Sequence, residues 1–455
     1  MGRGRIGARG RADKCDHRVN KVRIVIRALD VRAGRQAQDR LADCGVEAPI
    51  LLGDAGGPDG VDVALVAIGS TAPREAAAFA DAATCAHPTL CVVAGALDAP
   101  VLDAALGLPA PFDAWVALDA PPALLKRRIK SIYRAAVARE ESARRAATAN
   151  ALALSDEFTA APSRRLKALF VGAPNPFFLA LERAWGARGG YVTAAFSSFS
   201  GFDHLHDEQF DAVALNAVDD APTAIALCAA LRRNASLNNL PTLVLTRARD
   251  AGTVEAVIAR GASVTIGEDE SSDAALSWLF ESVRHERGRR EVERALNAWG
   301  DRLGDVRTGL FTAPSFTPHL ARLAEDHQES GRPLSVIAMR IDAAPGARAP
   351  APVAWDKGFT EVATLTGRLI RDVDCAAVVG PDIIACALPA TTLSGARRAA
   401  ERIASVGECT AFAAGDEGGG PLVFEQSIAE LKPGEGGAGL LARALDAIHC
   451  DALRA

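Results

Sequence analysis

The sequence of 455 residues lacks three kinds of pattern, and each absence excludes a class of protein. No apolar run approaches the roughly 20 residues that span a bilayer, so we expect no membrane insertion. The eight histidines and nine cysteines are dispersed and include no Cys-x-x-Cys pair, so we expect no metal and no other cofactor. The net charge of −5 gives no general attraction to nucleic acid, and we expect no DNA partner.

The composition is that of a globular protein. Hydrophobic residues make up 49% of the chain, which is typical of soluble domains. An odd number of cysteines in so long a chain favours reduced thiols and predicts a cytoplasmic protein. Basic residues gather among glycines in residues 1–21, with no apolar run to anchor them. We interpret this segment as a disordered basic tail; an arm that meets nucleic acid or lipid is the alternative.

The length predicts about three domains. Two stretches, 22–150 and 164–298, alternate β-branched runs with helical spacing, which predicts parallel sheets covered on both faces. A linker at 151–163 separates them, and each stretch ends in a long helix, which indicates an internal duplication. The charged helix 124–150 is typical of a solvated connector. The expected strands are 22–26, 61–68, 90–93 and 115–118, then 166–171, 191–196, 212–215, 242–245 and 263–266.

Both stretches resemble the receiver domains of bacterial response regulators, a doubly wound parallel fold. In receivers, an Asp at the end of the third strand takes a phosphoryl group. Here the matching positions are Ala67 and Asn216. A methyl group cannot act as a nucleophile and an amide is a poor one, so we expect neither unit to accept phosphate. We interpret both units as docking or dimerisation modules.

The remaining stretch, 299–455, has a different pattern. It reads Asp-Val-Arg-Thr-Gly-Leu at 305–310, Arg-Ile-Asp after a strand at 334–339, and Gly-Pro-Asp-Ile-Ile at 380–384. These segments resemble the GGDEF family of diguanylate cyclases, which implies an α+β domain with a mainly antiparallel sheet. The resemblance places four substitutions at positions that the family uses for catalysis: Arg340, Pro381, Ile383 and Ala452.

These substitutions remove the family's catalytic groups. Arg340 stands where the first metal-binding Asp is found, and Pro381 fixes φ at a Gly-Gly step that lets the backbone approach GTP. Ile383 replaces the acidic residue of the hairpin, and Ala452 replaces a Lys that contacts phosphate. Without metal ligands, two-metal phosphoryl transfer is lost, so we expect no enzymatic activity.

A second site of the family is retained in the sequence. Arg371 and Asp374 form an Arg-x-x-Asp turn five residues before the hairpin, and Arg402 follows in the next helix. In the family this turn binds cyclic di-GMP, so the resemblance implies that these three residues bind that dinucleotide. Arg can give two hydrogen bonds to guanine O6 and N7, and Asp can accept from guanine N1 and N2. The alternative is a surface pair of little consequence, because the motif occurs elsewhere in the chain.

The order of two receiver-like units and a degenerate GGDEF-like domain resembles non-catalytic members of this family in alphaproteobacteria. The resemblance implies a homodimeric cyclic di-GMP receptor and scaffold at a cell pole. Its implied protein partners are protease adaptors and a cell-cycle regulator, within cell-cycle-regulated proteolysis. Two alternatives stay open: a weak diguanylate cyclase, and an assembly protein that works through its receiver faces without nucleotide.

Overall fold

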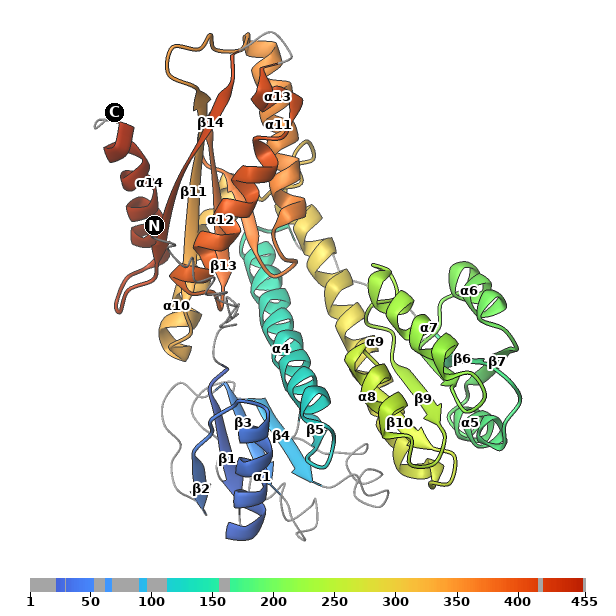
Figure 1. The fold of residues 1–455 in the computed structure, drawn as a ribbon. Helices are drawn as coiled ribbons and strands as arrows, with labels where there is room; N and C mark the ends of the chain where they lie inside the picture. The colour runs from blue at the N-terminus through green and yellow to red at the C-terminus, as the bar shows by residue number, and fades with distance from the viewer. Residues whose placement is uncertain are drawn as a thin grey trace, which may run out of the picture.

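A computed structural model describes residues 22–28, 30–52, 62–67, 90–95, 113–154, 164–415 and 420–452 of the chain (Figure 1). Two parallel sheets are followed by one antiparallel sheet. The predicted tail at 1–21 and most of the predicted linker, residues 155–163, lie outside the described residues. No helix in the described ranges combines the length and hydrophobicity of a membrane span.

The first unit is a five-stranded parallel sheet in the order β2-β1-β3-β4-β5. Its central strands β1 and β3 are buried along their whole length, which explains their continuous apolar sequence. The short β2 was not predicted. The elements are β1 (Ile24–Ala28), α1 (Val31–Asp43), β2 (Ile50–Leu52), β3 (Val63–Ala67), β4 (Leu90–Gly95), β5 (Ala114–Ala117) and α4 (Pro122–Ala151).

The second unit repeats this plan in the order β10-β9-β8-β6-β7. If the strands of this unit are counted from β6, the order is 2-1-3-4-5, as in the first unit. This is the flavodoxin-like arrangement. The duplication extends to a buried carboxylate before each third strand, Asp62 and Asp211, which accept from the main-chain N–H groups of Arg23 and Lys167. The elements are β6 (Lys167–Val171), α5 (Pro176–Gly186), β7 (Tyr191–Ala195), α6 (Ser198–Asp207), β8 (Ala212–Asn216), α7 (Ala221–Arg233), β9 (Thr242–Thr246), α8 (Ala251–Ala259), β10 (Val264–Gly267) and α9 (Ser272–Leu303).

The third unit is a four-stranded antiparallel sheet in the order β12-β13-β11-β14. Its two faces bury separate apolar clusters, one with α10 and α14 and the other with α11 and α12. The elements are α10 (Ala313–Ser330), β11 (Leu334–Ala343), α11 (Pro352–Leu369), β12 (Cys375–Val378), β13 (Ile383–Pro389), α12 (Leu393–Gly407), α13 (Ala411–Ala414), β14 (Leu422–Glu430) and α14 (Gly437–Ala452). The predicted mixture of parallel sheets and an antiparallel sheet is confirmed.

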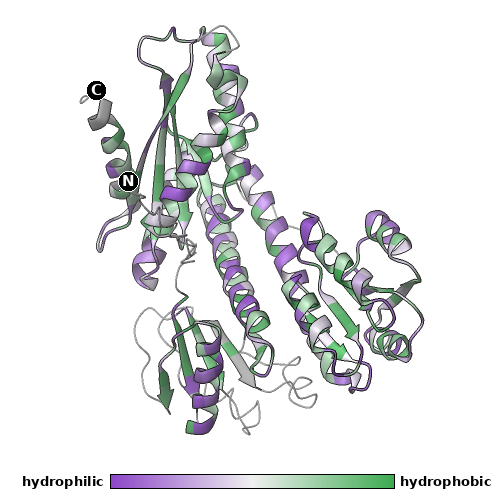
Figure 2. Cartoon of the chain, viewed as in Figure 1, coloured by the Kyte–Doolittle hydropathy of each residue, from purple (hydrophilic) through white to green (hydrophobic). Residues whose placement is uncertain are grey.

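Helices α4 and α9 pack side by side and extend from the parallel sheets to the antiparallel one (Figure 1). Hydrophobic residues line the strands, whereas α4 and α9 mix polar and apolar residues along their length (Figure 2). The prediction that α4 is a solvated connector is wrong. Glu141, Arg144 and Arg145 are buried because other helices and one another satisfy their charges, and Ala149 joins the core of the third unit.

Candidate functional site

The predicted Arg-x-x-Asp pair lies in the short turn between α11 and β12, and its two side chains bond to each other. The Arg371 Nη2 and Nε groups lie 2.6 and 3.2 Å from Asp374 Oδ1, and the Arg371 main-chain N–H donates to Asp374 Oδ2 at 2.9 Å. The turn is closed by a hydrogen bond of 2.8 Å from the Asp374 N–H to the Arg371 carbonyl. This geometry is stronger than a surface pair because one carboxylate accepts from both the side chain and the backbone of Arg371.

A second group of acceptors fixes the Arg371 guanidinium. Its Nη2 donates to Thr391 Oγ1 at 2.7 Å and to the Pro389 carbonyl at 3.2 Å. Thr391 is buried and donates its own hydroxyl to Pro389 at 2.9 Å, so its oxygen is held in place. The Arg371 side chain is nevertheless 52% exposed, and its Nη1 has no hydrogen-bond partner among the described residues. One edge of a pre-oriented guanidinium is therefore available to a ligand.

Asp374 is placed differently from Arg371. Its side chain is only 3% exposed, and burial raises the pKa of its carboxyl group although Arg371 opposes that rise. In this conformation the carboxylate orients Arg371 and is closed to an incoming base. A direct bond from Asp374 to guanine requires the carboxylate to turn outward.

Arg402 reaches the same turn from α12. Its Nη2 donates to the Leu369 carbonyl at 2.9 Å, two residues before Arg371. Arg398 is exposed one helical turn earlier on the same side of α12. The structure therefore brings all three predicted ligand-binding residues to the end of α11, with more positive charge beside them.

The inner side of the turn is held by the first unit. The Arg145 Nη2 donates to the carbonyls of Asp372 and Asp374 at 2.8 and 2.9 Å. The other nitrogens of Arg145 donate to the Leu296 carbonyl of α9 at 3.1 Å and to Glu141 at 2.8 Å. A single buried guanidinium thus connects α4, α9 and the candidate site.

Glu141 anchors this connection from a fully buried position. It accepts from Arg145, from Arg144 at 3.1 Å and from His319 at 3.0 Å. Burial alone would raise the pKa of this carboxyl group, but the neighbouring His319 and arginines hold it well below its usual value. Glu141 therefore stays ionised and keeps both arginines in position.

The catalytic positions of the family hold groups of a different chemistry. Arg340 on β11 pairs with Ile383 across the sheet, and its Nη2 lies 2.7 Å from the Glu425 carboxylate on β14. A cation and an apolar side chain therefore occupy the positions at which the resemblance implies acidic metal ligands. Ala452 lies in the last turn of α14, and its side chain is outside the described residues.

The hairpin between β12 and β13 is covered by an aromatic residue. Trp355 on α11 donates its indole N–H to the Pro381 carbonyl at 3.3 Å, and its ring lies 5.7 Å from that of Phe412. A side chain at Gly358 would lie 2.0 Å from the Phe412 ring, so glycine permits this close packing. Among the described residues, no group of His, Cys, Asp or Glu could hold a metal ion.

The positions that match receiver phosphoacceptors are closed as well. Asn216, at the end of β8, donates to the Ala173 carbonyl at 2.9 Å and accepts from the Val218 N–H at 3.0 Å. A Cβ at Gly172 would lie 2.8 Å from the Asn216 Cβ, so only glycine fits beside Asn216 at position 172. Ala67 ends β3 as a buried methyl group. Neither position presents a nucleophile.

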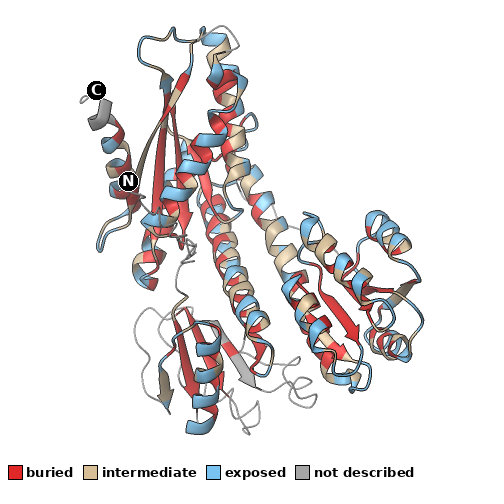
Figure 3. Ribbon diagram, in the orientation of Figure 1, coloured by how far each residue is buried: buried red, intermediate tan, exposed pale blue. Residues whose placement is uncertain are grey.

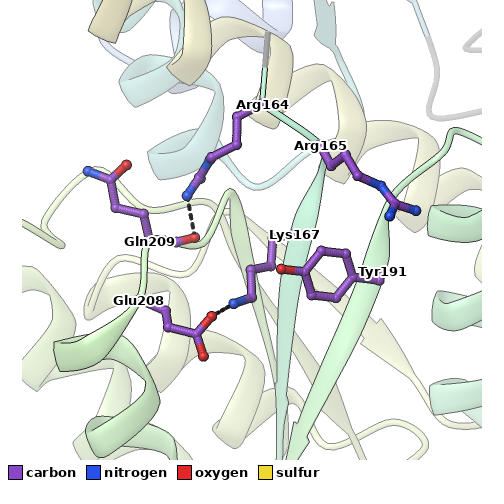
Figure 4. Close-up of a pocket in the computed structure, with 6 residues that line it drawn as sticks. All are labelled: Arg164, Arg165, Lys167, Tyr191, Glu208 and Gln209. Atoms are coloured by element: carbon purple, nitrogen blue, oxygen red, sulfur yellow. Dashed lines mark hydrogen bonds and ion pairs between the residues drawn. The ribbon is translucent and has the colours of Figure 1, made fainter. Parts of the chain in front are cut away.

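One pocket of about 790 Å³ lies at the amino ends of β6 and β7 (Figure 4). Lys167 forms an ion pair there with Glu208, and Arg164 donates to the Gln209 carbonyl at 2.7 Å. Because Lys167 and Arg164 are already bonded to protein groups, we assign no ligand to this pocket. Its lining residues are Arg164, Arg165, Lys167, Tyr191, Glu208 and Gln209.

Sequence reasoning did not identify two residues that support the candidate site. Thr391 follows Arg371 by 20 positions and Arg145 precedes it by 226, and neither belongs to a motif. Arg144 and Arg145 are adjacent arginines on a long helix, and this pattern alone does not indicate that they are buried. Their burial is explained only by partners elsewhere in the chain.

Comparisons with known proteins are limited to parts of the chain. No protein-family model and no curated protein matches it. It is similar to the GGDEF domain of DgcB from Caulobacter crescentus, solved in complex with c-di-GMP (23% identity, 33% of this chain and 87% of that one, TM-score 0.28). It is also similar to the FimX GGDEF domain from Pseudomonas aeruginosa (15%, 34% and 95%, 0.29). A putative response regulator from Chloroflexus aurantiacus is similar as well (19%, 26% and 98%, 0.25).

Proposed function

We propose that this chain is a non-catalytic receptor for cyclic di-GMP that recruits protein partners. The observation that carries the proposal is the geometry of the turn. Asp374 and Thr391 fix the Arg371 guanidinium while one of its edges stays exposed, and Arg402 reaches the same turn from α12. The Nη1 group of a guanidinium held in this way can donate to a ligand with little further loss of side-chain entropy.

The chemistry of the ligand fits these groups. Guanine presents O6 and N7 as neighbouring acceptors, and the Nη1 group of Arg371 can donate to them. Arg402 can stack on a base or neutralise a phosphate, and the exposed Arg398 adds charge on the same side of α12. Two guanines linked through phosphates match a cluster that combines planar donors with positive charge.

The residues at and beside the hairpin support the proposed absence of catalysis. Arg340 is paired with Glu425, and Ile383 provides no metal ligand. Pro381 lies beneath Trp355, at the step where the family requires backbone access to GTP. Two-metal phosphoryl transfer has no ligands at these positions.

The scaffold role rests on the resemblance to PopA, which has two receiver-like units before a degenerate GGDEF domain. That resemblance implies a homodimer in the cytoplasm that acts at a cell pole, with protease adaptors and a cell-cycle regulator as partners. In this chain α4 and α9 already pack against each other, so those two helices join the two units within one chain. Ligand binding would favour one arrangement of the units if its affinity for two arrangements differs.

Isothermal titration calorimetry with cyclic di-GMP tests the binding proposal. We expect micromolar or tighter binding by the wild type and its loss in Arg371→Ala. Arg247→Ala is the matched control, because Arg247 belongs to another Arg-x-x-Asp of the chain and donates to the Val218 carbonyl at 2.6 Å. Equal heats from the wild type and Arg371→Ala would overturn the proposal.

A further inference from the structure

Three phenylalanines that lie close together in the sequence are exposed in the second unit. Phe196, Phe199 and Phe202 are 69%, 76% and 37% exposed, and they lie at the end of β7 and on α6. The chain has 16 phenylalanines, and these three are the only ones among the exposed large hydrophobic residues of the described part. Such clustering of aromatic side chains in solvent is typical of an interaction surface.

The exposure results from how α6 is packed. The helix contacts the sheet through Gly201 and the buried Leu205, and a Cβ at Gly201 would lie 3.1 Å from the Val171 side chain. Phe199 and Phe202 are three residues apart and therefore share one face of the helix, turned from the sheet. Phe196 precedes the N-cap Ser197, where a residue such as Phe usually packs on the fourth helical residue, but here that residue is Gly201.

This surface lies at the outer end of the second unit. Helix α6 packs against β6, β7 and α7 of its own unit (Figure 1), and its outer side is exposed along most of its length (Figure 3). No other unit of the chain covers it in the described ranges. The aromatic side chains are therefore open to another molecule.

Acidic residues border the three phenylalanines. Asp203 and Asp207 are exposed on α6, and within the described residues neither forms an ion pair or a side-chain hydrogen bond. Phe199, Asp203 and Asp207 follow one another at intervals of four residues, so the two aspartates continue the row of the helix surface that begins at Phe199. An apolar centre with an acidic border is complementary to an apolar segment flanked by lysine or arginine.

We propose that Phe196, Phe199 and Phe202, with Asp203 and Asp207, form a docking site for a short basic amphipathic helix of another protein. The inference goes beyond nucleotide binding and does not depend on it, because the surface shares no residue with the Arg371 turn. The apolar anchors of the partner helix would pack on the rings, and its basic residues would pair with the aspartates.

A second copy of the chain is a poor occupant of this surface. Three partly exposed phenylalanines offer about 300–400 Å² of apolar surface. A stable dimer buries about 800 Å² on each partner. A twofold axis would also bring together two copies of the same acidic border, and like charges oppose that contact. A short segment of opposite charge needs less buried area and is attracted by the aspartates.

Fluorescence anisotropy with a synthetic probe tests the proposal on the full chain. The probe is an amphipathic peptide of about 18 residues, or five helical turns, with leucine on one face and lysine on the other. A second peptide has glutamate in place of lysine. We expect the lysine peptide to bind, and the double variant Phe199→Ser, Phe202→Ser to weaken binding by about tenfold or more. Leu179→Ser, an exposed leucine on α5, is the control and should bind as the wild type does.

A charge reversal separates this site from general attraction between acidic protein and basic peptide. The double variant Asp203→Lys, Asp207→Lys should lose the lysine peptide and gain the glutamate peptide. Three results would overturn the proposal: no binding of the lysine peptide at about 100 µM, equal binding by the phenylalanine variant, or a change of oligomeric state in that variant by sedimentation. The last result would show that a second copy covers the surface.

Discussion

Arg145 and Asp374 are joined through the main chain: the Arg145 guanidinium donates to the Asp374 carbonyl at 2.9 Å, while the Asp374 carboxylate faces Arg371. The same guanidinium donates to the Leu296 carbonyl of α9. The candidate site therefore shares a rigid connection with both long helices. A ligand that alters this turn would act on α4 and α9 through these hydrogen bonds, and the coupling would be equal in both directions.

We predict that Arg145→Lys weakens cyclic di-GMP binding by about tenfold, because lysine cannot span both carbonyls and α9 at once. Calorimetry measures the dissociation constant. Arg144→Lys is a close control, since Arg144 shares Glu141 with Arg145 but bonds Asp326 instead of the turn. Both variants should lose some stability. If both bind the dinucleotide equally well, Arg145 has only a packing role.

Because Asp374 is buried, we predict that a substitution there can weaken ligand binding without lowering the stability of the fold. Burial raises the pKa of its carboxyl group in the folded state, so by linkage the ionised form costs stability at neutral pH and the cost fades as pH falls. We expect Asp374→Asn to leave the melting temperature unchanged or higher while it weakens cyclic di-GMP binding, since an amide holds Arg371 less firmly.

Asp372→Asn provides the comparison for that variant. Asp372 is exposed in the same turn, and its contact with Arg145 is made by the main-chain carbonyl. Both its melting temperature and its dissociation constant should match the wild type. A large drop in the melting temperature of Asp374→Asn would show that the ionised carboxylate stabilises the fold.

The sequence predicted the parts of this molecule that depend on neighbouring residues. Strands such as β3 and β8 are buried on both faces, so their apolar runs are continuous and predict strands. The apolar run of β2 is only three residues long, and the strand is only partly buried. The contact between Arg371 and Asp374 is likewise local, because the two residues are three positions apart in one turn.

The sequence did not predict the contacts between residues that are far apart in the chain. The charged residues of α4 indicated solvent, yet Glu141 is buried because His319, 178 positions later, donates to it. Thr391 supports Arg371 from the start of the next helix, and no spacing rule connects the two. A buried charge can be predicted only when its partner is known, and His319 belongs to a different unit from Glu141.

The contact between the two parallel units predicts sensitivity to acid. His285 on α9 bonds Ser131 on α4 at 2.8 Å, and burial, with Arg128 and Arg284 nearby, lowers its pKa from 6.5 to about 3. Between these values the unfolded chain binds the proton and the folded chain does not, so stability falls as pH drops below about 6.5. We expect the melting temperature to decrease over this range.

His285→Gln should reduce that decrease, because glutamine can bond Ser131 and does not titrate. His206→Gln is the control, since His206 is exposed on α6. Melting curves of the three proteins between pH 7.5 and pH 5 decide the matter. Identical pH dependence in the wild type and His285→Gln would assign the acid sensitivity to other groups, such as the buried His327.

Restoring one catalytic residue should damage the fold without restoring activity. Arg340 lies between Glu425 and Asp342, 2.7 and 4.0 Å from their carboxylates, with its side chain 15% exposed. Arg340→Asp places a third carboxylate there, and we expect a loss of about 2 kcal/mol, more than in Arg340→Met. Incubation with GTP and Mg²⁺ should give no cyclic di-GMP for the wild type or either variant, because Pro381 and Ile383 remain. Any turnover that an Asp382→Ala substitution abolishes would instead assign the chain a weak cyclase activity.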